Sequence, residues 1–154
     1  MEVQTFHFRL RNLSEILIVS QQLSEYFTEP DEVAIGIYEL LINAVEHGNL
    51  GIGYDQKSEL IRQGIWESEI NRRMNLAENA DKEVDVSLVR GRQECALTIC
   101  DQGKGFNWQH YLNMAPQLDR LHGRGLLIAS HCKFDSLVFN AAGNVVTCMA
   151  RSAA

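Results

Sequence analysis

The chain has 154 residues, of which 45% are hydrophobic and 22% are charged, and its formal net charge at pH 7 is −6. This composition is typical of one globular domain with a substantial core, and it argues against a disordered chain. The sequence has no run of Lys and Arg, so a surface for duplex nucleic acid is not expected. No apolar run reaches the length of a membrane span, and the first residues do not follow a signal-peptide pattern. We therefore expect a cytoplasmic protein with no membrane or nucleic-acid partner.

The cysteines favour the same compartment. Cys95, Cys100, Cys132 and Cys148 form no C-x-x-C pair, and each lies in an apolar segment. Buried free thiols are the ordinary state of such cysteines in a reducing cytoplasm.

The first part of the chain predicts a strand followed by two helices. Polar and apolar residues alternate within residues 1–10, which predicts a strand. Apolar residues at helical spacing predict a helix over residues 13–27. Pro30 suits the first turn of a second helix, which we expect to continue to Gly48.

The middle of the chain contains an insertion, residues 51–82. Its apolar residues lie on about one helical face and predict a helix around residues 56–75, although Gly64 weakens this prediction. This helix could add to the core, cover a site or bind a partner. An exposed Trp66 would favour partner binding, whereas a buried Trp66 would make the helix structural.

After the insertion, the period of the apolar residues changes to two. Residues 84–88 and 96–100 predict two strands of a hairpin. A short helix is expected at residues 108–114 and an apolar helix at residues 125–133. The final strands are expected at residues 136–140 and 144–151, and they close the chain.

This order of elements predicts the fold class. Helices and strands do not alternate regularly, so we expect an α+β fold in one domain that spans residues 1–154. Its architecture would be a two-layer sandwich, with helices on one face of a mixed, mostly antiparallel sheet.

Polar residues interrupt the apolar helix in the segment YELLINAVEHGN, residues 38–49. Glu39 and Asn43 are four residues apart, so they share one face of the helix, and His47 continues the row. An amide oxygen can take one position in a Mg²⁺ shell, and a carboxylate one turn away can hold or deprotonate a hydroxyl. A solvated helix face is the alternative interpretation.

Two glycine-containing segments could also bind a ligand. In ICDQGKGFNW, residues 99–108, Asp101 follows a strand and could accept a hydrogen bond from an amine such as that of adenine. In HGRGLLIAS, residues 122–130, glycines precede an apolar helix whose free N–H groups could bind phosphate. An Asp-Gly turn and an ordinary helix start are the respective alternatives.

Together the three segments resemble one superfamily. ELLINAVEHG is similar to the N-box of the GHKL, or Bergerat-fold, ATP-binding domain, DQGKGF to its first glycine box, and GRGL to its second. The resemblance spans nearly the whole chain. It is strongest to the bacterial anti-sigma-factor serine/threonine kinases, and it implies ATP and Mg²⁺ as cofactors.

The resemblance also implies roles for individual residues. Asn43 would ligate Mg²⁺, Glu39 would be the general base, and Asp101 would bind the adenine amine. Residues 106–122 would form a mobile lid over ATP. The family often has Gly-Thr in its last motif where this chain has Gly143-Asn144, which leaves the adenine contact there open. The residues expected to contact ATP are Asn43, His47, Asp101, Gly103, Gly105, Phe106, Gly123, Arg124, Gly125, Leu126 and Asn144.

By this resemblance, the chain would transfer the γ-phosphate of ATP to a small STAS-type antagonist protein, and it could bind a sigma factor or form a homodimer. One alternative is a nucleotide-gated module that sequesters a sigma factor or another regulator without turnover. Another is a histidine-kinase ATP-binding domain that acts on a separate chain. The latter is disfavoured because the short segment GRGLLIAS resembles the anti-sigma type more closely. His7 lies on a predicted strand and not in a helical hairpin, which argues against a self-contained sensor histidine kinase.

Overall fold

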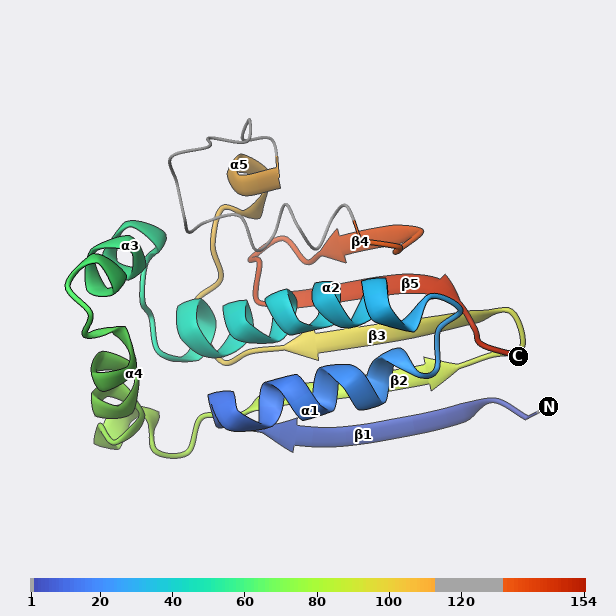
Figure 1. Cartoon of the computed structure of the whole chain (residues 1–154), viewed down its shortest axis with the longest axis horizontal. Coiled ribbons are helices and arrows are strands. Elements are labelled where there is room, and N and C mark those ends of the chain that lie inside the picture. Colours follow the sequence, from blue (N-terminus) through green and yellow to red (C-terminus); the bar gives the residue numbers. More distant parts are fainter. Residues whose placement is uncertain (1, 113–131) are drawn as a thin grey trace.

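A computed structural model describes residues 2–112 and 132–154. These residues form an α+β fold around one five-stranded sheet with the order β1-β2-β3-β5-β4 (Figure 1). The prediction of a mixed sheet was wrong, because every described pair of neighbouring strands is antiparallel. Short hairpins join β2 to β3 and β4 to β5, and a hairpin reverses the chain direction. The strands are β1 (Gln4–Leu10), β2 (Val84–Arg90), β3 (Glu94–Cys100), β4 (Ser136–Phe139) and β5 (Val145–Arg151).

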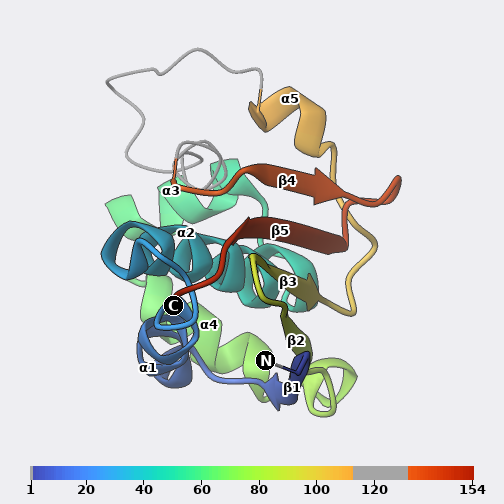
Figure 2. The ribbon, with the colours of Figure 1, turned by 90° about the vertical axis from the view of Figure 1, so that its right-hand side faces the viewer.

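Two helices cover one face of this sheet. Helices α1 (Leu13–Ser24) and α2 (Pro30–Asn43) lie side by side along the strands, as expected for a two-layer arrangement (Figures 1 and 2). Alternate residues of each strand face the helices and form the core, as in β2, where Val84, Val86 and Leu88 are fully buried. The hydrophobic pattern of the sequence therefore sets which face of the sheet is covered.

Helix α2 carries the polar row singled out in the sequence. It begins at Pro30, as predicted, and two acidic residues in its first turn favour the positive end of the helix. After Asn43, the chain continues directly into η1 (Ala44–Asn49), which is a π-helix. A π-helical turn shifts the register of side chains along a helix and is frequent at functional sites.

The insertion forms two helices where one was predicted. Helices α3 (Tyr54–Arg62) and α4 (Trp66–Met74) lie at one end of the sandwich (Figure 1). Between them, Gly64 has a φ of +72°, a conformation that ends a helix and favours glycine. Apolar side chains of both helices join the core, and a short 3₁₀ turn, η2 (Ala77–Asn79), leads into β2.

Other sequence predictions have mixed outcomes. Helix α5 (Trp108–Leu112) confirms the start of the expected short helix, whereas the helix expected at residues 125–133 lies almost wholly outside the described residues. All four cysteines are free thiols. In the part of the chain that the structure describes, no helix is long and apolar enough to cross a membrane.

Candidate functional site

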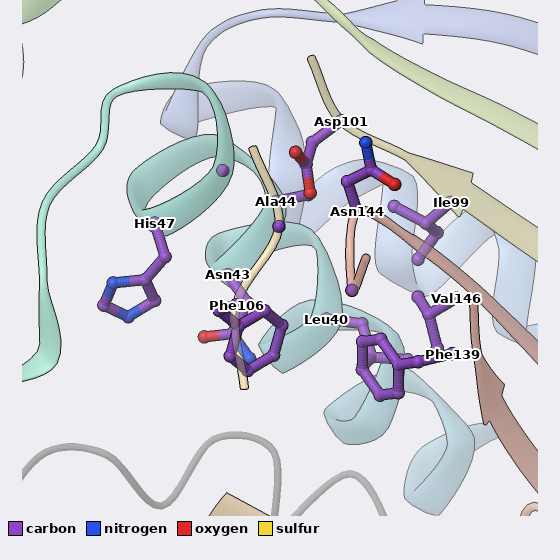
Figure 3. Close-up of a pocket in the computed structure, with 13 residues that line it drawn as sticks. Leu40, Asn43, Ala44, His47, Ile99, Asp101, Phe106, Phe139, Asn144 and Val146 are labelled. Carbon is purple, nitrogen blue, oxygen red and sulfur yellow. The ribbon is translucent and has the colours of Figure 1, made fainter. Parts of the chain in front are cut away.

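The end of α2, the loop after β3 and the β4–β5 turn meet at a small cavity of about 30 Å³ (Figure 3). Its apolar wall comes from the helix layer and from the sheet, and its polar groups come from α2, η1 and the two loops. The apolar side chains are Leu40, Ala44, Ile99, Phe106, Phe139 and Val146, and the polar side chains are Asn43, His47, Asp101 and Asn144.

A larger, open cavity of about 690 Å³ adjoins the first. The two cavities share His47, Gly48, Gly105 and Phe106 in their linings, so they form one continuous depression. The outer cavity also contains two lysines, Lys82 and Lys104, and one acidic side chain, Glu78. Its charge balance favours an anionic ligand.

Asn43 has an unsatisfied polar group in the inner cavity. Among the described residues, its Nδ2 atom is buried and has no hydrogen-bond partner. A buried polar group without a partner costs about 1–3 kcal/mol. Because Nδ2 is a donor, a ligand atom that accepts its hydrogen bond would recover that cost, whereas a cation would bind the Oδ1 atom of the same amide.

Asp101 is held in place by two glycines. The backbone N–H of Gly103 donates to Oδ1 of Asp101 at 2.8 Å. A Cβ atom on Gly48 would lie 2.3 Å from Cγ of Asp101, so the carboxylate can occupy this position only beside a glycine. Burial raises the pKa of Asp101 to about 6, and the Gly103 hydrogen bond opposes that rise.

The loop after β3 is fitted closely to the β4–β5 turn. Gly105 has a φ of +84°, and a Cβ atom there would lie 1.8 Å from the carbonyl oxygen of Ala142. Asn144 Nδ2 donates to the Gly103 carbonyl at 3.3 Å, and Asn144 Oδ1 accepts from Asn140 Nδ2 at 2.6 Å. The side chain of Asn144 therefore joins the two loops, in addition to lining the cavity.

His47 connects the site to the insertion. Its ring stacks on that of Tyr54 with 3.8 Å between the ring centroids, and Nδ1 is hydrogen-bonded to the carbonyl oxygen of Ile52. Burial is the largest influence on the pKa of His47 and lowers it. His47 therefore presents a neutral ring to both cavities at neutral pH.

Glu39 lies one helical turn before Asn43 but lines neither cavity. Its side chain is half-buried. Burial raises the pKa of Glu39, the positive charge of Lys57 opposes the rise, and the negative charge of Glu46 adds to it. A carboxylate with a raised pKa is suited to proton transfer near neutral pH.

The structure thus brings together most of the predicted residues that it describes. Asn43, His47, Asp101, Gly105, Phe106 and Asn144 line the inner cavity, and Gly103 lines the outer one. The remaining predicted contacts, Gly123, Arg124, Gly125 and Leu126, lie outside the described residues.

Sequence reasoning missed Gly48 and the two lysines of the outer cavity. Gly48 follows a long apolar segment, and a glycine in that position predicts only the end of a helix. Lys82 lies in a polar connection, and its ammonium group donates to the backbone carbonyl of Asn49 at 3.2 Å. Lys104 lies inside the DQGKGF motif, and its position between two glycines was the only available signal.

No protein-family model matches this chain, and a search of curated proteins finds no match either. The function is therefore inferred from the residues and their geometry.

Proposed function

We propose that this chain is a GHKL-type, Bergerat-fold ATP-binding domain that acts as a protein serine/threonine kinase of the anti-sigma-factor type. One observation carries the proposal: Asn43, Asp101 and the Gly103–Gly105 loop all line one depression. Asn43 is about sixty residues away from the other two in the sequence. The N-box and the first glycine box of the resemblance supply these residues.

The inner cavity has the chemistry required for adenine. Its apolar walls suit the faces of a purine, and the carboxylate of Asp101 can accept a hydrogen bond from the exocyclic amine. At about 30 Å³ the cavity has room for about one or two water molecules, so a purine would require a neighbouring side chain to move. Phe106 is the candidate, because it lines both cavities at the start of the expected lid.

The outer cavity and Asn43 suit the phosphates and their cation. Lys82 and Lys104 would attract the triphosphate. The Oδ1 atom of Asn43 would take one position in the shell of Mg²⁺, and its unpartnered Nδ2 would donate to a phosphate oxygen. Bound Mg²⁺ would neutralise phosphate charge during in-line transfer. Glu39 would orient and deprotonate the attacking hydroxyl of a STAS-type protein substrate.

The alternative of a docking module lacks support from α4. Trp66 is half-buried, and its indole N–H donates inward to Oε1 of Glu46 at 2.5 Å. Ile70 is 2% exposed, and Ile65, just before the helix, is 44% exposed. Trp66 and Ile70 are therefore packed within the molecule, which supports a structural role for this helix, whereas Ile65 is exposed.

Nucleotide selectivity tests the proposed base contact. We expect ATP to bind about tenfold or more tightly than GTP, because guanine presents a carbonyl oxygen where adenine presents the amine, and Asp101 would repel it. Competition of both nucleotides against a fluorescent ATP analogue measures this ratio. Equal affinities would remove Asp101 from base recognition.

The pH dependence of binding is a second expectation. Because the pKa of Asp101 is about 6, its carboxylate is ionised above that pH and becomes a protonated, weaker acceptor below it. ATP affinity should be constant at neutral pH and should fall as the pH decreases through about 6. Titration of the wild-type chain with the ATP analogue at several pH values measures this. Affinity that stays constant through pH 6 would contradict a carboxylate of Asp101 in base recognition.

A further inference from the structure

Glu46 is a buried acid that the proposed reaction does not use. It lies in η1 between Asn43 and His47, and its side chain is 0% exposed. Burial of a carboxylate is costly unless charged and polar partners surround it. The partners of Glu46 therefore indicate what its burial accomplishes.

Both carboxylate oxygens of Glu46 have partners from the insertion. Lys57 Nζ, on α3, donates to Oε2 at 2.6 Å, and Trp66 Nε1, on α4, donates to Oε1 at 2.5 Å. The Lys57 ammonium also lies 5.5 Å from the centroid of the Trp66 ring, which is a cation–π distance. One buried side chain thus connects both inserted helices to the end of the α2–η1 helix.

Helix α3 also forms part of the cavity wall, through Tyr54. Tyr54, the first residue of α3, stacks on His47, and its ring centroid lies 6.2 Å from that of Phe106. Both of these contacts join α3 to residues that line the two cavities. A displacement of α3 would therefore displace a wall of the depression.

We infer that Glu46 is a positioning residue of the nucleotide site: by binding Lys57 and Trp66, it fixes the inserted helices so that Tyr54 supports His47 and Phe106. This inference rests on the proposed function for its consequence, which is nucleotide affinity. The attachment itself is a property of the fold. Glu46 acts through the insertion and does not contact the ligand.

Other contacts of the insertion make the test feasible. Arg73 Nη1 donates to the carbonyl oxygen of Leu50 at 3.0 Å, and Leu60 and Ile70 are buried in the core. The insertion should therefore remain folded when one Glu46 contact is removed, with a local loss of order and not global unfolding.

The experiment compares three variants of the full chain. Glu46→Gln removes the charge that faces Lys57, and Trp66→Phe removes the other donor while retaining an aromatic ring. Glu59→Gln is the matched control, because it neutralises an exposed acid of the same insertion. Two quantities are measured below the unfolding transition of every variant: affinity for a fluorescent ATP analogue, and amide hydrogen exchange across the chain.

We expect Glu46→Gln and Trp66→Phe to weaken binding about tenfold, which is within the range for residues that act through their neighbours. Exchange should accelerate in α3 and α4 and stay unchanged in α1, and Glu59→Gln should change neither quantity. Faster exchange with unchanged affinity would overturn the positioning role. Unchanged exchange would overturn the attachment itself. If the wild-type chain bound no nucleotide, the proposed function would fail, and exchange alone would decide whether Glu46 attaches the insertion.

Discussion

Replacing Glu39 with Gln is expected to lower phosphoryl transfer about a hundredfold or more while ATP affinity stays within about twofold of wild type. Gln has nearly the same size as Glu but cannot accept the proton of the attacking hydroxyl. Glu39 lines neither cavity, so the substitution should leave nucleotide contacts intact. Single-turnover transfer of label from γ-labelled ATP to a STAS-type substrate, together with a binding titration, measures both quantities.

The matched control for this variant is Glu32→Gln. Glu32 lies in the first turn of the same helix and is exposed, so its substitution makes the same chemical change away from the depression. We expect it to retain both transfer and binding. Retained transfer in Glu39→Gln would remove Glu39 from the role of general base. A parallel loss of ATP affinity would instead indicate a role in binding.

Replacing Gly105 with Ala is expected to lower the free energy of unfolding by about 3 kcal/mol. Two causes act together: the residue has a φ of +84°, and a Cβ atom would lie 1.8 Å from the carbonyl oxygen of Ala142. The loop and the β4–β5 turn would have to separate. Equilibrium unfolding in urea measures the change.

Gly51→Ala separates the two causes. Gly51 has a φ of +65°, but a Cβ atom there would meet no atom of the described residues within 4 Å. This variant should therefore lose only about 1 kcal/mol, from the backbone conformation alone. Equal losses in the two variants would mean that the close approach of the loop to Ala142 contributes nothing to stability.

Much of the fold could be predicted from local sequence patterns. Pro30 indicated the start of α2, and period-two segments indicated the β2–β3 hairpin, because each signal depends on residues close together in the chain. The pairing of β1 with β2 could not be predicted in this way. It joins residues about eighty positions apart, and their partner choice depends on the packing of the whole sheet.

The insertion shows how a local pattern can mislead. Its apolar residues kept one helical face across Gly64, so one helix was predicted. The left-handed conformation of Gly64 separates the segment into two helices, α3 and α4. Each of these helices still places apolar residues in the core. Helical periodicity reports which side is buried, and it does not report a change of direction at a single glycine.

The candidate site was predictable where a residue type has distinctive chemistry. Asn43 and Asp101 are polar residues at the ends of apolar elements, and this contrast is visible in the sequence. The role of Gly48 is not visible, because it depends on contact with a side chain more than fifty positions away. The contacts of Glu46 with the insertion depend in the same way on tertiary structure.

The most direct test of the central claim is titration of a fluorescent ATP analogue with and without Mg²⁺. Wild type should bind with micromolar-range affinity, and Mg²⁺ should tighten binding about tenfold. Asn43→Ala should lose the Mg²⁺-dependent gain, and Asp101→Asn should lose most of the binding. Asn71→Ala, which changes an exposed amide on α4, should behave as wild type. Folded wild-type protein that binds no analogue, or that binds equally well in the Asn43→Ala and Asp101→Asn variants, would contradict an ATP site at this depression.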